Sequence, residues 1–421
     1  MPPRPLVKVV GRRLDPEDYR LRDFLTRTAQ PHDFYEAGTP QADAVLAEAG
    51  ANGATLPVVV DGEAVHAGVT IEALANAWGV HAHPDRTHYD LFIVGAGPAG
   101  LAAAVYGASD GLSTAVAEAD VPGGQASYTS AIENFFGFVD PIGGAELARL
   151  AGRQAENFGA ELLLLNGVVH GRLSPDEPPL AKLASGDEVT SDIVIVAPGM
   201  EWRRLELDGV EELLGHGVYY GAGRSEAVQC SGERVIVVGA GNSAGQAVMN
   251  LATAGARVTQ VVRGDSLRKS MSAYLVDRIE AHDLIEVRLR SQVTEVHEQA
   301  GRLGAVTVES ADSAPDTVAA TAMFLCIGGV PRTAWAPSSG VQMDRNGFLL
   351  TGPDLLQDGK RPDGWPLDRD PLSLETNIPG VFAAGDVRHG SVKRVAAGVG
   401  EGAMAVQFIH QYLNSTRQTR S

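Results

Sequence analysis

Residues 89–100 read Tyr-Asp-Leu-Phe-Ile-Val-Gly-Ala-Gly-Pro-Ala-Gly, an apolar run followed by a Gly-x-Gly-x-x-Gly turn. The apolar run predicts a buried strand, and the apolar residues 101–109 after the turn predict a helix. In this context Gly95 allows a tight turn, Gly97 lets the backbone approach a pyrophosphate, and Gly100 lets the helix pack on the strand. The stretch therefore predicts a strand–turn–helix unit that binds a dinucleotide.

The residues that follow this turn indicate the kind of dinucleotide. The helix begins at Pro98 and Ala99, and its N-terminus offers unpaired N–H groups and a positive dipole end for phosphates. The next strand ends at Glu118, whose carboxylate accepts ribose hydroxyls and repels a 2′-phosphate. We expect FAD at this first site.

A second glycine turn follows the apolar strand 234–238. The strand after it ends in Arg263, and Arg268 and Lys269 follow in the next loop. Guanidinium groups suit a 2′-phosphate, so the pattern favours NADPH over NADH, although these cations can also be solvated surface charges. The residues predicted to bind this nucleotide are Gly239, Gly241, Asn242, Ser243, Ala244, Arg263 and Arg268.

Further motifs, in the right order along residues 89–412, resemble those of thioredoxin reductases. They include Gly-Gly-Gln at 123–125, Ile-Glu-Asn at 132–134, Ala-Pro-Gly at 197–199, Val-Phe-Ala-Ala-Gly-Asp-Val at 381–387 and Arg-Val-Ala at 394–396. The resemblance implies that these segments surround the flavin. The additional FAD residues that it implies are Gly124, Gln125, Asn134, Ala197, Gly199, Gly385, Asp386, Arg394, Val395 and Ala396.

The sequence departs from that family at its redox centre. Thioredoxin reductases carry Tyr-Cys-Ala-Thr-Cys where this chain has Tyr220-Gly221-Ala222-Gly223-Arg224. The chain has two cysteines, Cys230 and Cys326, and they do not form a C-x-x-C pair. Because disulfide exchange needs a thiolate, this site cannot relay electrons through a dithiol of its own.

The first 80 residues predict the order β-α-β-α-β-β-α, which resembles a thioredoxin or glutaredoxin domain. Leu56-Pro57 stands where that family has a cis-proline, and residues 12–16 replace its redox cysteines. A bacterial group that fuses such a domain to a reductase body is similar in three motifs. These motifs are Gly-Asn-Ser-Ala-Gly-Gln at 241–246, Val-Arg-Gly at 262–264 and the stretch 385–394.

The predicted fold class is α/β with three parts. Residues 1–86 form a thioredoxin-like domain without redox cysteines, 87–204 and 329–421 form a split FAD domain, and 205–328 form an inserted NAD(P) domain. Residues 352–375 predict a surface excursion because they are rich in Pro, Asp and Gly. The resemblance implies a homodimer. The Cys and His spacing predicts no metal site.

Composition limits the partners. The net charge of -18 makes nucleic acid an unexpected partner, since phosphate backbones would be repelled. The chain begins with no signal peptide pattern, and no apolar run reaches the roughly 20 residues that span a bilayer. We therefore expect no membrane association and a cytoplasmic location.

The leading functional hypothesis is an FAD-dependent oxidoreductase that moves electrons between NAD(P)H and a small molecule, a partner disulfide or oxygen. The alternatives are a reductase of ferredoxin-like carriers, a biosynthetic flavin oxidase or dehydrogenase that does not use NADPH, and a non-enzymatic redox sensor or scaffold. Tyr220, as a ring cover, and His389, as a proton donor, are the predicted catalytic residues. Tyr219, Arg224 and Lys393 are further candidates.

Overall fold

The fold was derived from a computed structural model, which describes residues 5–174, 177–221 and 224–420. The N-terminal unit contains a sheet in the order β2-β1-β3-β4, in which β1 and β2 are parallel and the other pairs are antiparallel. Its elements follow the predicted order. They are β1 (Val7–Gly11), α1 (Pro16–Arg27), β2 (His32–Glu36), α2 (Pro40–Glu48), β3 (Val58–Asp61), β4 (Ala64–Ala67) and α3 (Ile71–Ala77).

Local sequence explains helix α1. The Asp15 side chain accepts hydrogen bonds from the backbone N–H groups of the first turn, and proline occupies the start of the helix. Leu21, Phe24 and Leu25 lie on its buried face, as their spacing predicts. The Leu56–Pro57 peptide bond is cis.

The second unit is built on a seven-stranded sheet in the order β7-β6-β5-β10-β9-β8, with β21 paired to β10. The strands β7, β6, β5, β10 and β21 are parallel, and the β10–β9–β8 edge is antiparallel. Its elements are β5 (His88–Val94), α4 (Pro98–Ser109), β6 (Thr114–Ala117), the 3-10 helix η1 (Gly124–Tyr128), α5 (Gly144–Asn157), β7 (Glu161–Leu163), β8 (Val168–Arg172), β9 (Leu180–Leu183), β10 (Glu188–Val196), β21 (Val381–Ala383), the 3-10 helix η4 (Gly385–Val387) and α9 (Val395–Arg420).

The third unit has a parallel five-stranded sheet in the order β12-β19-β13-β14-β15. An antiparallel sheet of β16, β17 and β18, which sequence reasoning did not identify, lies between β15 and β19 in the chain. The elements are β12 (Val218–Tyr220), α6 (Arg224–Gln229), β13 (Arg234–Val238), α7 (Asn242–Thr253), β14 (Arg257–Val261), α8 (Ala273–Glu280), β15 (Ile285–Arg288), β16 (Ser291–Gln299), β17 (Arg302–Ser310), β18 (Ser313–Ala319) and β19 (Ala322–Leu325).

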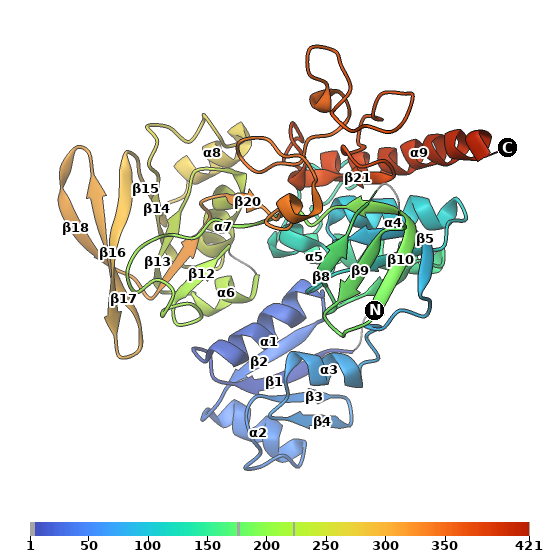
Figure 1. Cartoon of the computed structure of the whole chain (residues 1–421). Helices are drawn as coiled ribbons and strands as arrows, with labels where there is room; N and C mark the ends of the chain where they lie inside the picture. The colour runs from blue at the N-terminus through green and yellow to red at the C-terminus, as the bar shows by residue number, and fades with distance from the viewer. Residues whose placement is uncertain (1–4, 175–176, 222–223, 421) are drawn as a thin grey trace.

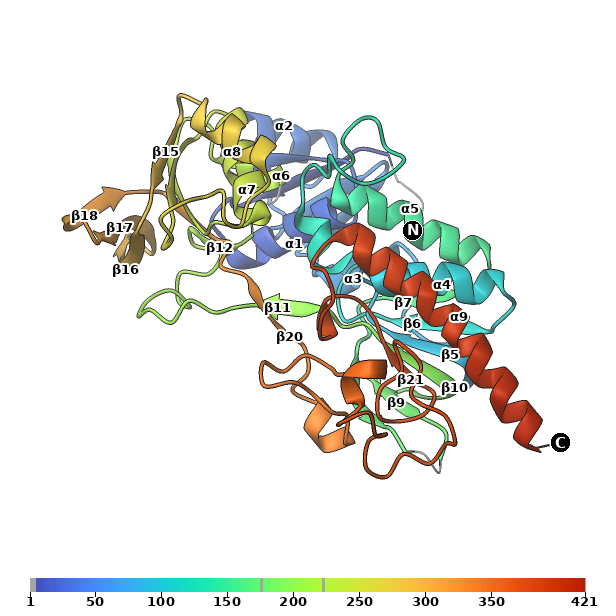
Figure 2. The ribbon, with the colours of Figure 1, turned by 90° about the horizontal axis from the view of Figure 1, so that it is seen from above.

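Two connections join the second and third units, and they run side by side (Figure 2). The strands β11 (Met200–Trp202) and β20 (Gly329–Pro331) pair antiparallel, and the Arg203 N–H donates to the Gly328 carbonyl at 3.0 Å. Sequence reasoning placed the two crossings near residues 204 and 328, so the pairing lies where they were expected. The insertion therefore leaves and re-enters the second unit at one place.

The N-terminal unit contacts both other units, with α1 at the junction (Figure 1). Tyr19 of α1 packs on Tyr219 of the third unit, with ring centroids 4.9 Å apart. Val121 of the second unit joins the hydrophobic core formed by β1, α1 and α3. The N-terminal unit is thus packed into the molecule by apolar contacts on two sides.

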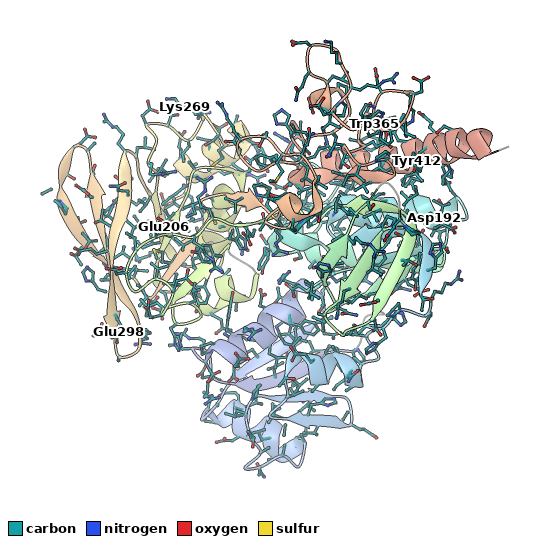
Figure 3. All side chains as sticks on the ribbon, viewed as in Figure 1. Asp192, Glu206, Lys269, Glu298, Trp365 and Tyr412 are labelled. Atoms are coloured by element: carbon teal, nitrogen blue, oxygen red, sulfur yellow. The ribbon has the colours of Figure 1, made fainter. Side chains whose placement is uncertain are left out.

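The excursion predicted at 352–375 projects from the second unit, and Trp365 marks it in Figure 3. It has one short 3-10 helix, η3 (Gly352–Leu355), and another 3-10 helix, η2 (Ala336–Ser339), precedes it. Among the described residues, the helices are all too short or too polar to cross a bilayer.

Candidate functional site

One cavity of about 360 Å³ gathers nearly all the residues predicted to bind FAD. Within the described chain, only Gly95 and Gly100 of that set are absent from its lining. The predicted residues that line it are Gly97, Pro98, Ala99, Glu118, Gly124, Gln125, Asn134, Ala197, Gly199, Gly385, Asp386, Arg394, Val395 and Ala396. They come from four stretches far apart in the sequence, which the seven-stranded sheet and its helices bring together.

Gly95 and Gly100 shape the turn behind this cavity. Gly95 has φ +101°, and a Cβ added there would lie 2.4 Å from the Ala197 carbonyl oxygen. A Cβ on Gly100 would lie 1.9 Å from the Gly95 carbonyl oxygen. Side chains at these two positions are therefore excluded by backbone atoms.

Gly97 has a different environment, and this bears on whether a cofactor fits. A Cβ added to Gly97 would meet no atom within 4 Å, so the position opens onto free space. Gly97 is also the N-cap of α4, and no side chain caps the helix. Uncapped N–H groups beside an open backbone position are what a pyrophosphate needs, so the cradle fits a dinucleotide.

Glu118 lies at the end of β6, and its carboxylate closes the glycine turn. It accepts hydrogen bonds from the backbone N–H of Ala96 at 2.7 Å and of Asp120 at 3.0 Å. Glu118 is buried, and burial raises the pKa of its carboxyl above the ordinary value. Each oxygen keeps lone-pair capacity for a further donor, such as a ribose hydroxyl.

Asp386 and Lys393 lie together on another wall of the cavity. The Lys393 ammonium donates to the Asp386 carbonyl oxygen at 2.6 Å. Burial raises the pKa of the Asp386 carboxyl and lowers the pKa of the Lys393 amine. Glu401 of α9 accepts the Gly385 N–H at 2.7 Å and pairs with Arg388, which anchors this segment.

The third unit contributes to the same cavity. Asn242 and Ser243, at the start of α7, line it, and so do Gln246, Ser272 and Tyr274. The second glycine turn, predicted for NADPH, therefore opens toward the predicted flavin site.

The backbone of this second turn is also close-packed. Gly239 has φ +143°, and a Cβ there would lie 2.2 Å from the Cys326 carbonyl oxygen. A Cβ on Gly241 would meet no atom within 4 Å, whereas Ala244 is fully buried. Gly239 and Gly241 thus repeat the closed and open environments of Gly95 and Gly97.

The cations predicted for a 2′-phosphate have unequal surroundings. Arg268 pairs with Asp277 at 2.7 Å and with Glu280 at 3.0 Å. Lys269 pairs with Asp265 at 2.7 Å and lies at the outer rim of the third unit, away from the N-terminal unit (Figure 3). Arg263 is exposed directly after β14. Among the described residues, Arg263 forms no ion pair with a carboxylate, unlike Arg268 and Lys269.

Neither predicted catalytic residue is among those that line the cavity. Tyr220 does not line the cavity; its hydroxyl accepts the Leu205 N–H at 3.0 Å. His389 does not line it either, and its Nδ1 lies 2.7 Å from Asp344. The Tyr220 hydroxyl and the His389 ring thus each have a local partner. Their catalytic roles are untested predictions.

Of the other candidates, Lys393 lines the cavity, whereas Tyr219 stacks on Phe324 in the core of the third unit. Ala222 and Gly223 lie outside the described residues, as does the Arg224 side chain. Both cysteines are buried and form no disulfide. Burial raises the pKa of the Cys326 thiol to about 12.

Several cavity residues were missed by sequence reasoning. Arg27 comes from α1 of the N-terminal unit, Tyr128 from η1 and Trp202 from β11, and Asp120 and Arg332 come from loops. None belongs to a motif with a known spacing. Their place at the cavity depends on how the units pack, which no local pattern encodes.

A possible metal site was also not expected from the sequence. Among the described residues, His81, Asp85 and Glu161 place ligand-type atoms within 4.8 Å of one another near the surface. Glu161 already accepts hydrogen bonds from the Tyr89 hydroxyl and the Asp85 N–H. These bonds explain the cluster without an ion.

Comparisons with known proteins agree with this geometry. The family model described as pyridine nucleotide-disulphide oxidoreductase matches residues 89–402. Thioredoxin reductase from Bacillus subtilis is 32% identical over 79% of this chain and 96% of the relative. The crystal structure of T. acidophilum thioredoxin reductase has 26% identity and a TM-score of 0.68, covering 79% of this chain and all of the other. The crystal structure of Lactococcus lactis thioredoxin reductase has 27% identity and a TM-score of 0.68, and the match covers 78% of this chain and 99% of the other.

These matches bear on cofactors and on the N-terminal unit. Thioredoxin reductases use FAD and NADPH, the two cofactors predicted from the glycine turns. The matched region begins at residue 89, so the N-terminal unit lies outside the family model.

Proposed function

Because the chain belongs to the pyridine nucleotide-disulphide oxidoreductase family and is thioredoxin-reductase-like, we propose that it is an FAD-dependent oxidoreductase whose electron acceptor is not a disulfide of its own. In this proposal NADPH supplies the electrons. The acceptor is a small molecule, a disulfide of a partner protein, or oxygen.

The shared cavity carries the proposal. Residues predicted for FAD form most of its walls, and Asn242 and Ser243 of the second glycine turn line the same space. An oxidoreductase with two nucleotides needs both reacting ends in one enclosed place. This arrangement supports electron transfer between the two nucleotides and accounts for the pairing of the two glycine turns in one chain.

The protein's part in this chemistry is binding and electrostatics, whereas bound FAD would supply the two-electron redox chemistry. The α4 N-terminus would hold the pyrophosphate, and Glu118 would accept the ribose hydroxyls. Asp386 would contact the ribityl chain, as the resemblance implies. Lys393 holds the Asp386 backbone in place through its 2.6 Å hydrogen bond.

The cysteines support an acceptor outside the chain. Gly221 and Arg224 stand where thioredoxin reductases carry their redox pair. Cys230 and Cys326 are both buried, and thiolate formation at Cys326 is disfavoured by its raised pKa. We therefore also propose that the chain is not itself a thioredoxin reductase, although its relatives carry that name.

The remaining predictions belong to the same proposal. In it the N-terminal unit, residues 1–86, is thioredoxin-like without redox cysteines, 87–204 and 329–421 are the split FAD domain, and 205–328 are the inserted nucleotide domain. The chain acts in the cytoplasm as a homodimer. The element order β-α-β-α-β-β-α supports the thioredoxin-like assignment.

Steady-state kinetics tests the proposal. The FAD-loaded protein is given NADPH with either an artificial electron acceptor such as ferricyanide or oxidised thioredoxin. We expect NADPH oxidation with ferricyanide and none above background with thioredoxin. Thioredoxin reduction at the rate of the artificial acceptor would contradict the proposal that the chain is not itself a thioredoxin reductase. A failure to oxidise NADPH with either acceptor would contradict the proposed electron donor.

A further inference from the structure

Arg27 is a buried cation that the N-terminal unit places at the wall of the cavity. It is the last residue of α1, and its side chain is 7% exposed. It lines the same cavity as Glu118 and Gly124, which belong to the second unit. A charged group this buried is stable only where its partners compensate for the lost water.

Three partners of Arg27 lie within residues 120–128 of the second unit. Its Nη1 lies 2.6 Å from an Asp120 carboxylate oxygen, and its Nε donates to the Ser127 hydroxyl at 3.0 Å. The guanidinium also lies over the Tyr128 ring, 4.2 Å from the centroid. Asp23 of α1, at 3.4 Å, is the fourth partner. Three contacts thus join one side chain to residues 120–128.

Two of these contacts lead to residues predicted for FAD, and a third leads to the cavity wall. The Asp120 N–H donates to the carboxylate of Glu118, the predicted ribose acceptor, at 3.0 Å. By holding Asp120, Arg27 therefore also helps to position Glu118. The Ser127 hydroxyl donates to the Gly124 carbonyl at 2.7 Å, so Arg27 also braces the Gly-Gly-Gln loop. Tyr128 lines the cavity and packs edge-on against Trp202.

We propose that Arg27 is a positioning residue of the flavin site, and that the cysteine-free N-terminal unit is retained in part to supply it. This inference rests on the proposed FAD site. The family model begins at residue 89, so the bracing side chain lies outside the region shared with the family. The N-terminal unit is then a structural component of cofactor binding, independent of any disulfide chemistry.

The test compares Arg27→Met with wild type and with Arg20→Gln. Arg20 lies on the same helix, is largely exposed, and pairs with Glu17 of that helix. Apoprotein is titrated with FAD to obtain the dissociation constant, and the visible circular dichroism of the bound flavin is recorded. The urea midpoint of each apoprotein is measured in parallel, because a purely structural role would change that midpoint alone.

We expect Arg27→Met to weaken FAD binding by about tenfold or more and to change the flavin dichroism. Arg27→Lys should recover only part of the affinity, because one ammonium cannot reproduce the planar fork that reaches Asp120 and Ser127 together. Arg20→Gln should match wild type in all three measurements.

Ser127→Ala and Asp120→Asn keep the inference testable if Arg27→Met does not fold, since the first removes the hydroxyl that accepts from the guanidinium and the second removes the charge of its carboxylate partner. Both should weaken FAD binding in the same direction by a smaller factor. Wild-type FAD affinity and dichroism in the folded variants would overturn the inference and leave the proposed function intact. A wild-type apoprotein that binds no FAD would overturn both.

Discussion

The two glycine turns share a backbone plan but differ in the side chain that holds them. In the first, the buried Glu118 carboxylate accepts the Ala96 N–H at 2.7 Å. In the second, the buried Gln260 amide donates to the Gly239 carbonyl at 2.9 Å. In the proposed assignment Glu118 would place a negative group beside the first nucleotide, whereas the side chain that holds the second turn is neutral and fully buried. The same fold unit can thus serve a free ribose in one place and a phosphorylated ribose in the other.

The comparison also separates glycines that the fold requires from glycines that a ligand requires. At Gly100 and Gly239 an added Cβ would meet backbone oxygen at 1.9 Å and 2.2 Å. At Gly97 and Gly241 it would meet nothing within 4 Å. The first pair should govern stability, and the second pair should govern cofactor affinity.

The largest effect is expected from Gly100→Ala. Its Cβ would overlap the Gly95 carbonyl oxygen, so α4 would have to move away from β5, at a cost of about 3 kcal/mol or more in stability. The urea midpoint of the apoprotein measures this. Gly97→Ala is the matched control and should lower the stability by less than about 1 kcal/mol. Equal urea midpoints for the two variants would contradict the distinction between glycines that the fold requires and glycines that a ligand requires.

The next effect separates the two turns by ligand. Gly97→Ala should retain the fold but lower FAD affinity by about tenfold or more, because the methyl group would fill the approach of the pyrophosphate. Gly241→Ala should keep its FAD and raise KM for NADPH by about tenfold. Flavin content and steady-state kinetics give the two readouts. Loss of flavin from Gly241→Ala would show that the turns are assigned to the wrong nucleotides.

A smaller effect is expected at the rim of the second turn. Arg263→Ala should reduce kcat/KM for NADPH by about tenfold and leave the value for NADH unchanged, because a guanidinium–phosphate bond is lost. Arg268→Ala should change the NADPH value less, since Arg268 already pairs with Asp277 and Glu280. A larger loss of kcat/KM for NADPH in Arg268→Ala than in Arg263→Ala would show that Arg268, and not Arg263, binds the 2′-phosphate.

The smallest effect is expected at the cysteines. Cys230→Ser and Cys326→Ser should each keep NADPH turnover within about twofold of wild type, because neither cysteine lines the cavity. Because the pKa of the Cys326 thiol is raised to about 12, the thiolate fraction at this position rises only as the pH approaches that value. Alkylation of the native protein should be slow at neutral pH. Rapid alkylation of Cys326 there would contradict the buried thiol.

Sequence reasoning located most of the fold and most of the cavity. The glycine turns, Glu118 and the stretch 385–396 carry strong local patterns, since backbone geometry dictates small residues at fixed spacings. The element order of the first 80 residues and the two chain crossings also match the structure.

The rest depended on packing between units. Arg27 reaches the cavity only because α1 lies at the junction of the other two units, and an arginine at a helix end has no distinctive local pattern. Tyr220 and His389 were expected at the flavin from their motifs, but Leu205 and Asp344 take up their polar atoms. The antiparallel β16–β18 sheet was missed because its strands are largely exposed and have a weak apolar pattern.

Anaerobic titration of the FAD-loaded protein with NADPH, following the visible flavin absorbance, tests the central claim most directly. A chain whose only two-electron centre is its flavin should bleach completely at one equivalent of NADPH per flavin. NADH at the same concentration should bleach it less effectively. An end point at two equivalents would reveal a second two-electron centre, such as an internal disulfide, and would contradict the claim. No bleaching by either nucleotide would show that the second glycine turn does not deliver electrons to the flavin.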